Sequence, residues 1–239
     1  TEHFALSLLE DHEGIVPTIL QQAGIDVALF VAHLRKMWAS DVGAELNKLL
    51  DEKMGLRILA NPYIGTRHLG LRTTKKIMKP ADLAGIKLRM PPGEVWQFVG
   101  TAMGANPTPL PFPEVYAALE QGAIDGQENP VAVIAANKFW EVQKFVALTN
   151  HQYNPQSVIF SKKVWDKLTP DQQKIIKEES VKAGNFMRKA VRDGEAQQIA
   201  ELKKLGVEVS SPDKAPFKKL MGPAYDRMKA IADEENINA

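Results

Sequence analysis

Lys87-Leu88-Arg89-Met90-Pro91 and Gly126-Gln127-Glu128-Asn129-Pro130 are the two stretches that predict the fold of this chain. Each places polar groups at the end of a short apolar strand, directly before a helix. In an open α/β sheet, ligands bind at the edge where strands end and helices begin. The two stretches therefore predict a cleft in which Arg89 binds a small anion and Asn129 contributes to selectivity for its shape. Neither stretch pairs a nucleophile with a base, which favours capture of a ligand over its conversion.

The rest of the sequence alternates between strand and helix patterns. Short apolar runs predict strands at residues 56–60, 67–72, 86–90, 123–125, 145–149, 157–161 and 207–209. Residues with helical spacing lie between most of these runs, with proline at helix starts and glycine after helix ends. This alternation predicts an α/β fold with a largely parallel sheet. On this reading residues 126–129 form a turn, and Pro130 begins the next helix.

A long helix is predicted late in the chain. Thr169-Pro170-Asp171-Gln172 is typical of a capping box with proline at the first helical position. The helix that follows, at about residues 170–205, meets no breaker before Gly206 other than Gly184 and Gly194. At ~1.5 Å per residue it spans roughly 50 Å, longer than a compact domain needs. It is therefore expected to cross between two lobes, and it offers a surface for a homodimer.

Composition narrows the classes of function. The 239 residues are 44% hydrophobic, enough for one large domain or two small ones with a core. A formal net charge of +1 gives no field for nucleic acid or an anionic membrane, so recognition of an anion must be local. No run approaches ~18 consecutive apolar residues, so no membrane insertion is expected. The chain starts at Thr1 without a signal-peptide pattern, which favours a processed or truncated protein.

Arg89 is the main candidate for a binding residue. Its neighbours Leu88 and Met90 predict a buried strand, and a buried guanidinium requires an anion because it loses its hydration. Two interpretations remain on spacing alone. Arg89 forms an internal ion pair, with Glu94 or Asp125, or it clamps a ligand carboxylate through its planar fork.

The other candidate residues also have ordinary structural interpretations. Asn129 precedes a helix and can cap its N-terminus, a role that still leaves a donor or acceptor for a ligand. Arg67, near the start of a strand, is expected when taken alone to be a solvated surface residue. Phe112 is expected to pack in the core or at its rim, but its place beside the extended segment 108–111 also suits the wall of a pocket.

Catalytic and metal motifs are absent from the sequence. Cysteine is missing, which removes disulfides, thiolate metal sites and cysteine nucleophiles. The histidines are His3, His12, His33, His68 and His151. None of them is paired at the spacings that zinc enzymes use, and no glycine-rich phosphate loop or glycine-flanked serine elbow is present. We therefore expect no metal, no cofactor and no enzymatic activity.

Five segments stand in order at the spacing of one known family. They are Ile86-Lys-Leu-Arg-Met-Pro91, Gly104-Ala-Asn-Pro-Thr-Pro109, Glu114-Val-Tyr-Ala-Ala-Leu119, Asp125-Gly-Gln-Glu-Asn-Pro130 and Lys138-Phe-Trp-Glu-Val-Gln-Lys144. From about residue 39 to the C-terminus, the sequence resembles the solute-binding proteins of tripartite ATP-independent periplasmic (TRAP) transporters. The resemblance implies a two-lobed fold like that of periplasmic binding proteins, with a second lobe at about residues 66–155 and a long helix crossing the lobes. It also implies a periplasmic location, closure around the ligand, and delivery to a TRAP membrane permease.

The resemblance assigns roles to the candidate residues. The arginine that matches Arg89 forms the salt bridge to the ligand carboxylate in that family, and the asparagine that matches Asn129 contacts the same group. Gly65-Thr66-Arg67 resembles the sialic-acid-binding branch, in which this arginine also reaches the carboxylate. Phe112 matches an aromatic pocket residue of that branch. The implied ligand is an organic acid, and C4-dicarboxylates, sialic acid, sugar acids and aromatic acids all share the clamp.

Residues 1–38 depart from the family pattern. Family members begin with βαβ structure that builds much of the first lobe, so here the first lobe is expected to be incomplete. Instead, residues 1–38 resemble the helical repeat at the amino terminus of Clp-type AAA+ chaperones. This leaves a second function, a protein-interaction module led by the N-terminal helices. A third, an acid-processing enzyme on the same scaffold, needs a general base near Arg89, and none is evident.

Overall fold

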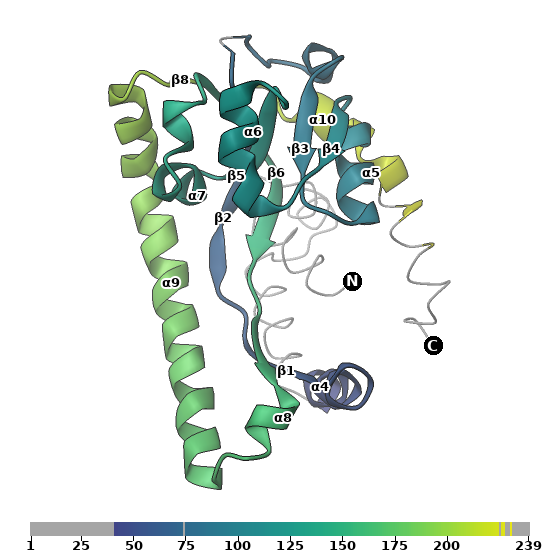
Figure 1. The fold of residues 1–239 in the computed structure, drawn as a ribbon, viewed down its shortest axis with the longest axis vertical. Coiled ribbons are helices and arrows are strands. Elements are labelled where there is room, and N and C mark those ends of the chain that lie inside the picture. Colours follow the sequence, from purple (N-terminus) through teal and green to yellow (C-terminus); the bar gives the residue numbers. More distant parts are fainter. Residues whose placement is uncertain (1–40, 74, 225, 228–229, 231–239) are drawn as a thin grey trace, which may run out of the picture. The chain divides into compact units, whose positions relative to one another are not determined.

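The computed structural model describes residues 41–73, 75–224, 226–227 and 230. The chain divides into two compact units. Unit 1 comprises Thr1–Gly65 and Tyr153–Gly194, and unit 2 comprises Thr66–Gln152 and Glu195–Ala239. Three elements have residues in both units: strands β2 and β6 and the long helix α9 (Figure 1).

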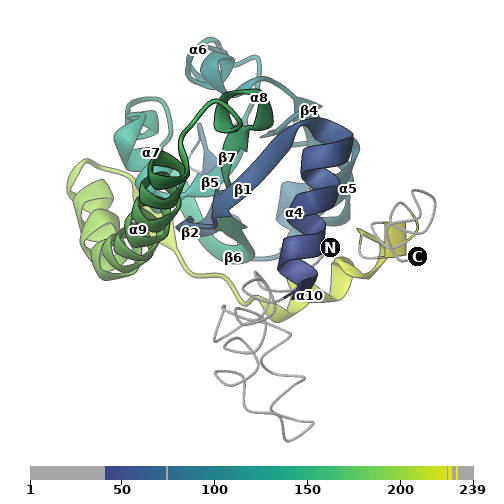
Figure 2. The same ribbon diagram turned by 90° about the horizontal axis from the view of Figure 1, so that it is seen from below.

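Unit 1 is built around a small antiparallel sheet. Strand β1 (Leu56–Ala60) pairs with β7 (Val158–Ser161). Helix α4 (Asp41–Met54) packs on β1, and the short helix α8 (Lys162–Trp165) follows β7 (Figure 2). Gly55 has a φ of +63°, a conformation that glycine adopts without strain, so the chain leaves α4 and enters β1 within one residue.

Unit 2 contains a six-stranded mixed sheet in the order β4-β3-β5-β2-β6-β8. In that order the strands are β4 (Asn106–Pro109), β3 (Lys87–Met90), β5 (Gly126–Pro130), β2 (Tyr63–Leu71), β6 (Phe145–Pro155) and β8 (Glu208–Ser210). Strand β3 runs parallel to β4 and to β5, and β6 runs parallel to β8, whereas β5 is antiparallel to β2. The predicted α/β fold is confirmed, but the sheet is mixed rather than largely parallel, since the long central strand β2 runs against β5.

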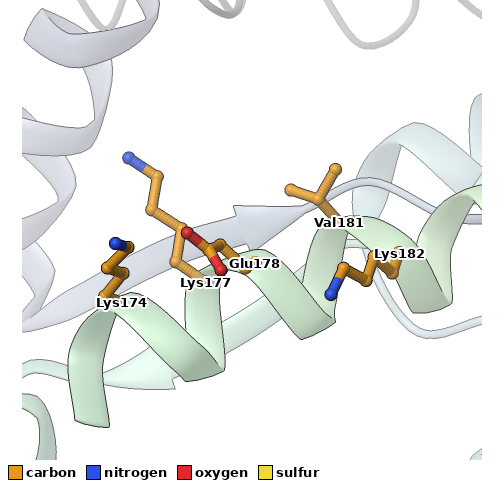
Figure 3. A pocket seen from close by; sticks show the side chains of 5 residues that line it. All are labelled: Lys174, Lys177, Glu178, Val181 and Lys182. Atoms are coloured by element: carbon orange, nitrogen blue, oxygen red, sulfur yellow. The ribbon is translucent and has the colours of Figure 1, made fainter. Parts of the chain in front are cut away.

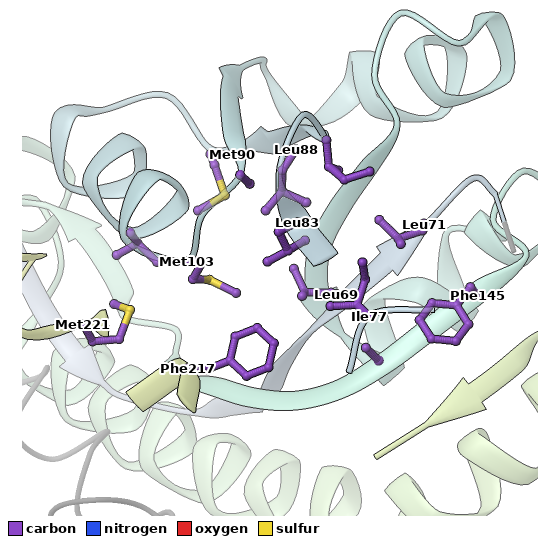
Figure 4. Close-up of a cluster of buried hydrophobic side chains, with 14 of the residues drawn as sticks. Leu69, Leu71, Ile77, Leu83, Leu88, Met90, Met103, Phe145, Phe217 and Met221 are labelled. Carbon is purple, nitrogen blue, oxygen red and sulfur yellow. The ribbon is translucent and has the colours of Figure 1, made fainter. Parts of the chain in front are cut away.

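Helices cover both faces of this sheet. They are η1 (Pro80–Leu83), α5 (Glu94–Ala102), η2 (Phe112–Glu114), α6 (Val115–Gln121), α7 (Val131–Ala136), η3 (Phe139–Glu141) and α10 (Ala215–Leu220). On one face, Leu88 and Met90 of β3 pack with Phe217 of α10 and Met103, which follows α5 (Figure 4). A second core on α6, α7 and η3 includes Leu119, Ile134 and Phe139. Because side chains alternate along a strand, one sheet supplies both cores.

Strand β5 corrects the sequence prediction. A strand was expected at residues 123–125 with a turn at 126–129, but residues 126–130 are themselves the strand and are buried throughout. Asp125 accepts a hydrogen bond from the backbone N–H of Lys87 at 2.9 Å, which holds the entry to β5 against β3. A polar stretch that begins with glycine and ends before proline has the pattern of a turn, but here pairing with β2 and β3 satisfies its backbone groups.

The predicted long helix is confirmed as α9 (Pro170–Lys204), which has 35 residues and is interrupted by neither Gly184 nor Gly194. Its capping box is present: the Gln172 N–H donates to Thr169 Oγ1 at 3.3 Å, and the Thr169 N–H donates to Gln172 Oε1 at 2.9 Å. These bonds satisfy N–H groups that a helix start leaves without intrahelical partners. Among the described helices, including this one, none combines the length and apolar character that a membrane crossing needs.

The variant Thr169→Ala is expected to lower the free energy of unfolding by about 1 kcal/mol, because it removes the side-chain acceptor of the cap. Chemical denaturation monitored by circular dichroism measures this loss. Thr169→Ser keeps the hydroxyl and is the matched control. Equal stability of the Ala and Ser variants would show that the cap contributes nothing.

Candidate functional site

The structure places three predicted site residues on neighbouring strands of unit 2, with Arg89 and Asn129 on one face of the sheet and Arg67 on the other. Arg89 lies on β3, Asn129 on β5 and Arg67 on β2, and these three strands are neighbours in the sheet. Arg89 is in register with Gln127 on β5, and Arg67 is in register with Pro130. The carboxyl ends of β3 and β5 therefore lie beside the first half of β2, at the edge of the sheet that is formed by the ends of the strands. This is the place where ligands bind in open α/β sheets.

Arg89 is buried, with 2% of its surface exposed. Its Nε donates to the backbone oxygen of Leu110 at 2.8 Å, and its guanidinium carbon lies 5.8 Å from the centre of the Phe112 ring. Neither predicted internal partner reaches it. The Glu94 carboxylate lies 3.0 Å from Arg227 Nη2, and Asp125 accepts from the backbone of Lys87. Within the part of the chain that the structure describes, no carboxylate forms an ion pair with Arg89.

Burial without an ion-pair partner lowers the pKa of Arg89 to about 10. The negative charge of Glu128 opposes this shift, and the positive charge of Arg67 adds to it. Arg89 is still protonated at neutral pH. The edge of the sheet thus holds a desolvated cation, which a carboxylate ligand would stabilise.

Arg67 is buried as well, with 4% of its surface exposed, so its interpretation as a solvated surface residue was wrong. Its Nη2 donates to Glu128 Oε1 at 2.6 Å and to the backbone oxygen of Glu128 at 2.7 Å, and its Nε donates to Oε2. The guanidinium carbon also lies 4.9 Å from the centre of the Trp96 ring. The partner Glu128 lies 61 positions away in sequence, and for that reason neighbouring residues gave no sign of the pair.

Glu128 is fully buried and also accepts a hydrogen bond from His151, whose Nε2 lies 3.1 Å from Oε2. Thr149 Oγ1 is bonded to the other ring nitrogen of His151 at 2.8 Å. Burial raises the pKa of Glu128, but the charge of Arg67 and the hydrogen bonds from His151 and Arg67 outweigh it, so the pKa lies below its usual range. Glu128 is thus an ionised carboxylate that holds Arg67 in place, a role that sequence reasoning missed.

A second buried histidine, His68, lies on the same strand as Arg67. Burial lowers the pKa of His68, and its neighbour Glu195 only partly opposes that effect. The backbone N–H of Asn150 donates to His68 Nδ1 at 3.3 Å, which leaves Nε2 to carry the proton toward Glu195 Oε1, 3.4 Å away. His68 is therefore a neutral side chain that links β2 to β6 and to α9.

Asn129 does not cap the following helix. The cap position of α7 is Pro130, and it has no side-chain capping bond, so the predicted capping role of Asn129 was wrong. Instead Asn129 Nδ2 donates to Gln127 Oε1 within the sheet. Phe112 is 39% exposed, and its ring centre lies 5.9 Å from that of Phe139. It therefore lies at the rim of the core beside Arg89, and its role as the wall of a pocket stays a prediction.

Among the described residues of unit 1, two hollows are present whose linings include none of these site residues. One follows the outer turns of α9 and is lined by Lys174, Lys177, Glu178, Val181 and Lys182 (Figure 3). The other lies between α4, β1 and Trp165, where Arg57 binds Asp51 and stacks on the Trp165 ring at 5.2 Å. Long, exposed side chains line the first hollow, and Arg57 already has a carboxylate partner in the second. The edge of the sheet in unit 2 remains the candidate site.

Comparison with known proteins identifies the family. The family of bacterial extracellular solute-binding proteins, family 7 (DctP), matches residues 30–231. The chain belongs to this family. The match begins before residue 39, so residues 30–38 fall within the family region and not only within the segment that was expected to depart from it. The resemblance of residues 1–38 to Clp-type chaperones lies outside the described residues and stays a prediction.

Relatives of known ligand support the same grouping. The chain is 38% identical over 193 residues to the sialic acid-binding periplasmic protein SiaP of Vibrio cholerae, covering 81% of this chain and 60% of that protein. Two solved TRAP periplasmic solute-binding proteins have TM-scores of 0.75. One, from Roseobacter denitrificans with bound 3-deoxy-D-manno-oct-2-ulosonic acid, is 38% identical, covering 80% of this chain and 63% of that one. The other, from Polaromonas with D-erythronate, is 39% identical, covering 85% and 66%.

The chain spans about three fifths of the length of the curated relatives that it matches, with 60%, 58% and 57% of the first three covered. The family assignment and the TRAP-type fold therefore rest on the shared region.

Proposed function

We propose that this chain forms part of an extracytoplasmic solute-binding protein that captures an organic acid through its carboxylate. One observation carries the proposal: Arg89 is a buried cation for which the described residues supply no carboxylate. A buried charge is costly unless it is paired, so an anion that enters from solvent would be stabilised by pairing with Arg89. The relatives named for sialic acid, 3-deoxy-D-manno-oct-2-ulosonic acid and D-erythronate bind acids, which supports the same choice.

The site residues receive distinct roles in this proposal. Arg89 forms the bidentate ion pair with the ligand carboxylate, Asn129 hydrogen-bonds to the same group, and Phe112 walls the pocket. Arg67 is held by Glu128 through Nε and Nη2, so Nη1 is the nitrogen with which it reaches the ligand. We propose binding without conversion, because Glu128, the nearest buried carboxylate to these arginines, is already held by Arg67 and His151.

The partners follow from the family and are also proposals. The acid is delivered to a TRAP-type membrane permease, and the protein works in the periplasm. A homodimer through α9 stays a prediction. Exposed apolar residues on that helix include Ile175, Val181 and Phe186, and sedimentation or light scattering of the purified chain tests whether copies associate through them.

The test of the function is a melting-temperature screen with N-acetylneuraminate, 3-deoxy-D-manno-oct-2-ulosonic acid, D-erythronate, L-galactonate and succinate. Each acid is compared with its methyl ester (the dimethyl ester for succinate), which lacks the charge that Arg89 would bind. An acid at ~100 times its Kd should stabilise the chain by about 2.7 kcal/mol, and its ester should not. Equal shifts with acid and ester, or no shift with any acid, would count against carboxylate capture. Binding of an unfolded model protein would instead favour the chaperone-type module at residues 1–38.

A further inference from the structure

Three buried carboxamides form a hydrogen-bonded chain beneath the candidate site. Asn129 Nδ2 donates to Gln127 Oε1, and Gln127 Nε2 donates to Gln143 Oε1 at 3.4 Å. Gln127 and Gln143 are completely buried and Asn129 is nearly so. Asn129 and Gln127 share one face of β5, since they are two residues apart. Arg89, in register with Gln127 on the neighbouring strand, shares that face.

The three hydrogen-bonded carboxamides fit into the sheet because the neighbouring position on β2 is a glycine, Gly70. Gly70 on β2 is in register with Gln127. A methyl group at Gly70 would collide with Gln143 Nε2 and would lie 2.9 Å from Gln127 Nε2. The two glutamine side chains therefore occupy the space above Gly70, and this is a built feature of the sheet rather than incidental surface contact.

The far end of the chain has a buried donor without an acceptor. Gln143 Nε2 has no hydrogen-bond partner among the described residues. Rotation of a carboxamide by 180° exchanges its oxygen and nitrogen at almost the same positions, so the chain can be hydrogen-bonded in two directions. In the reverse direction Gln143 Nε2 donates to Gln127 Oε1, and Gln127 Nε2 donates to Asn129 Oδ1. The orphan donor then has its acceptor, and Asn129 turns both N–H groups of Nδ2 away from Gln127.

We propose that Gln127 and Gln143 are positioning residues for ligand recognition, which set the direction of this amide chain and hence the group that Asn129 offers. The inference rests on the proposed carboxylate-binding function. A carboxylate only accepts hydrogen bonds, so it matches the direction in which Asn129 offers two donors. Gln143 thereby acts on ligand affinity through Gln127 and Asn129, without being bonded to the ligand.

The first test needs no ligand. Side-chain amide signals of Asn129 are followed by ¹⁵N NMR in the full chain and in Gln143→Met, which removes the end of the amide chain at similar volume. We expect the Asn129 amide signals to shift and to exchange faster with water, although Gln143 is not bonded to Asn129. The matched control is Gln97→Met, because Gln97 also has a buried atom without a partner but lies on α5, outside the amide chain. Unchanged Asn129 signals in both Gln143→Met and Gln127→Met would overturn the proposal.

The second test uses whichever acid of the panel raises the melting temperature. Gln143→Met should weaken its binding about tenfold, as expected for loss of one charge-assisted hydrogen bond to the carboxylate. In the Asn129→Ala background the same change should weaken binding less than twofold, since Gln143 acts through Asn129. Equal losses in both backgrounds would assign Gln143 a structural role only and overturn the proposal.

A further variant keeps the amide chain in place but fixes the direction of its hydrogen bonds. Gln143→Glu keeps the volume of the side chain and offers only acceptors when it is ionised. It therefore holds the amide chain in the direction in which Asn129 Nδ2 donates to Gln127 Oε1. Asn129 signals should stay protected in this variant while affinity for the acid falls. If no acid of the panel binds, the proposed function fails and the part of this inference that concerns ligands fails with it. The NMR result still decides whether the amide chain positions Asn129.

Discussion

Arg89→Ala is expected to abolish the rise in melting temperature that an organic acid causes, while the chain without ligand keeps or gains stability. The two effects have one origin. The guanidinium is desolvated and has no internal carboxylate, so its removal takes away an unfavourable buried charge. With a ligand present, the same removal leaves the carboxylate without its counter-charge. Affinity should fall ~100-fold or more, which corresponds to about 3 kcal/mol.

Isothermal titration with the acid selected by the screen measures the loss of affinity, and thermal unfolding without ligand measures stability. Arg89→Lys keeps the charge but not the planar fork, so it should bind with intermediate affinity. The matched control is Arg57→Ala in unit 1, where the arginine already has a carboxylate partner in Asp51. That variant should lose stability and retain binding. Retention of full affinity by Arg89→Ala would remove the basis of the proposed function.

Much of this architecture could be predicted because local patterns govern it. The cap at Thr169 and Gln172 and the lack of a strong breaker before Gly206 were sufficient to predict α9. The apolar run around Arg89 likewise predicted β3, and a buried arginine within that run predicted a guanidinium that requires an anionic partner. Such inferences need only neighbours in sequence, where propensity and periodicity act.

The polar interior could not be predicted, because its partners are distant in sequence. Arg67, with glycine and threonine before it, looks solvated until Glu128 of β5 is placed beside it. The same is true of Glu128, which in a Gly-Gln-Glu-Asn-Pro stretch looks like part of a turn. Its position between two neighbouring strands makes it a buried acid, and only the three-dimensional pairing supplies Arg67 and His151 as partners.

Glu128→Gln is expected to destabilise the chain by ~3–5 kcal/mol at neutral pH, the largest stability effect that this structure predicts. The new carboxamide could still accept a hydrogen bond, but it would leave the buried Arg67 without a counter-charge. Urea unfolding at pH 7 measures the difference. The double variant Arg67→Met/Glu128→Leu replaces both charges with apolar side chains and should recover most of the loss, since neither charge of this pair is then left buried without the other.

The pH dependence of the same carboxyl gives an independent check with a fixed sign. The pKa of Glu128 is lowered in the folded chain from its ordinary value of 4.5, so the unfolded chain binds a proton more readily. The contribution of Glu128 to stability is therefore complete above pH 4.5 and is lost as the pH falls toward the folded pKa. Glu128→Gln should flatten this part of the stability curve, because the variant side chain does not titrate there. Below pH 4.5, the stability of the wild-type chain should fall more steeply with pH than that of Glu128→Gln. Equal slopes for the two proteins would show that Glu128 and Arg67 do not form the buried ion pair that holds Arg67 in place.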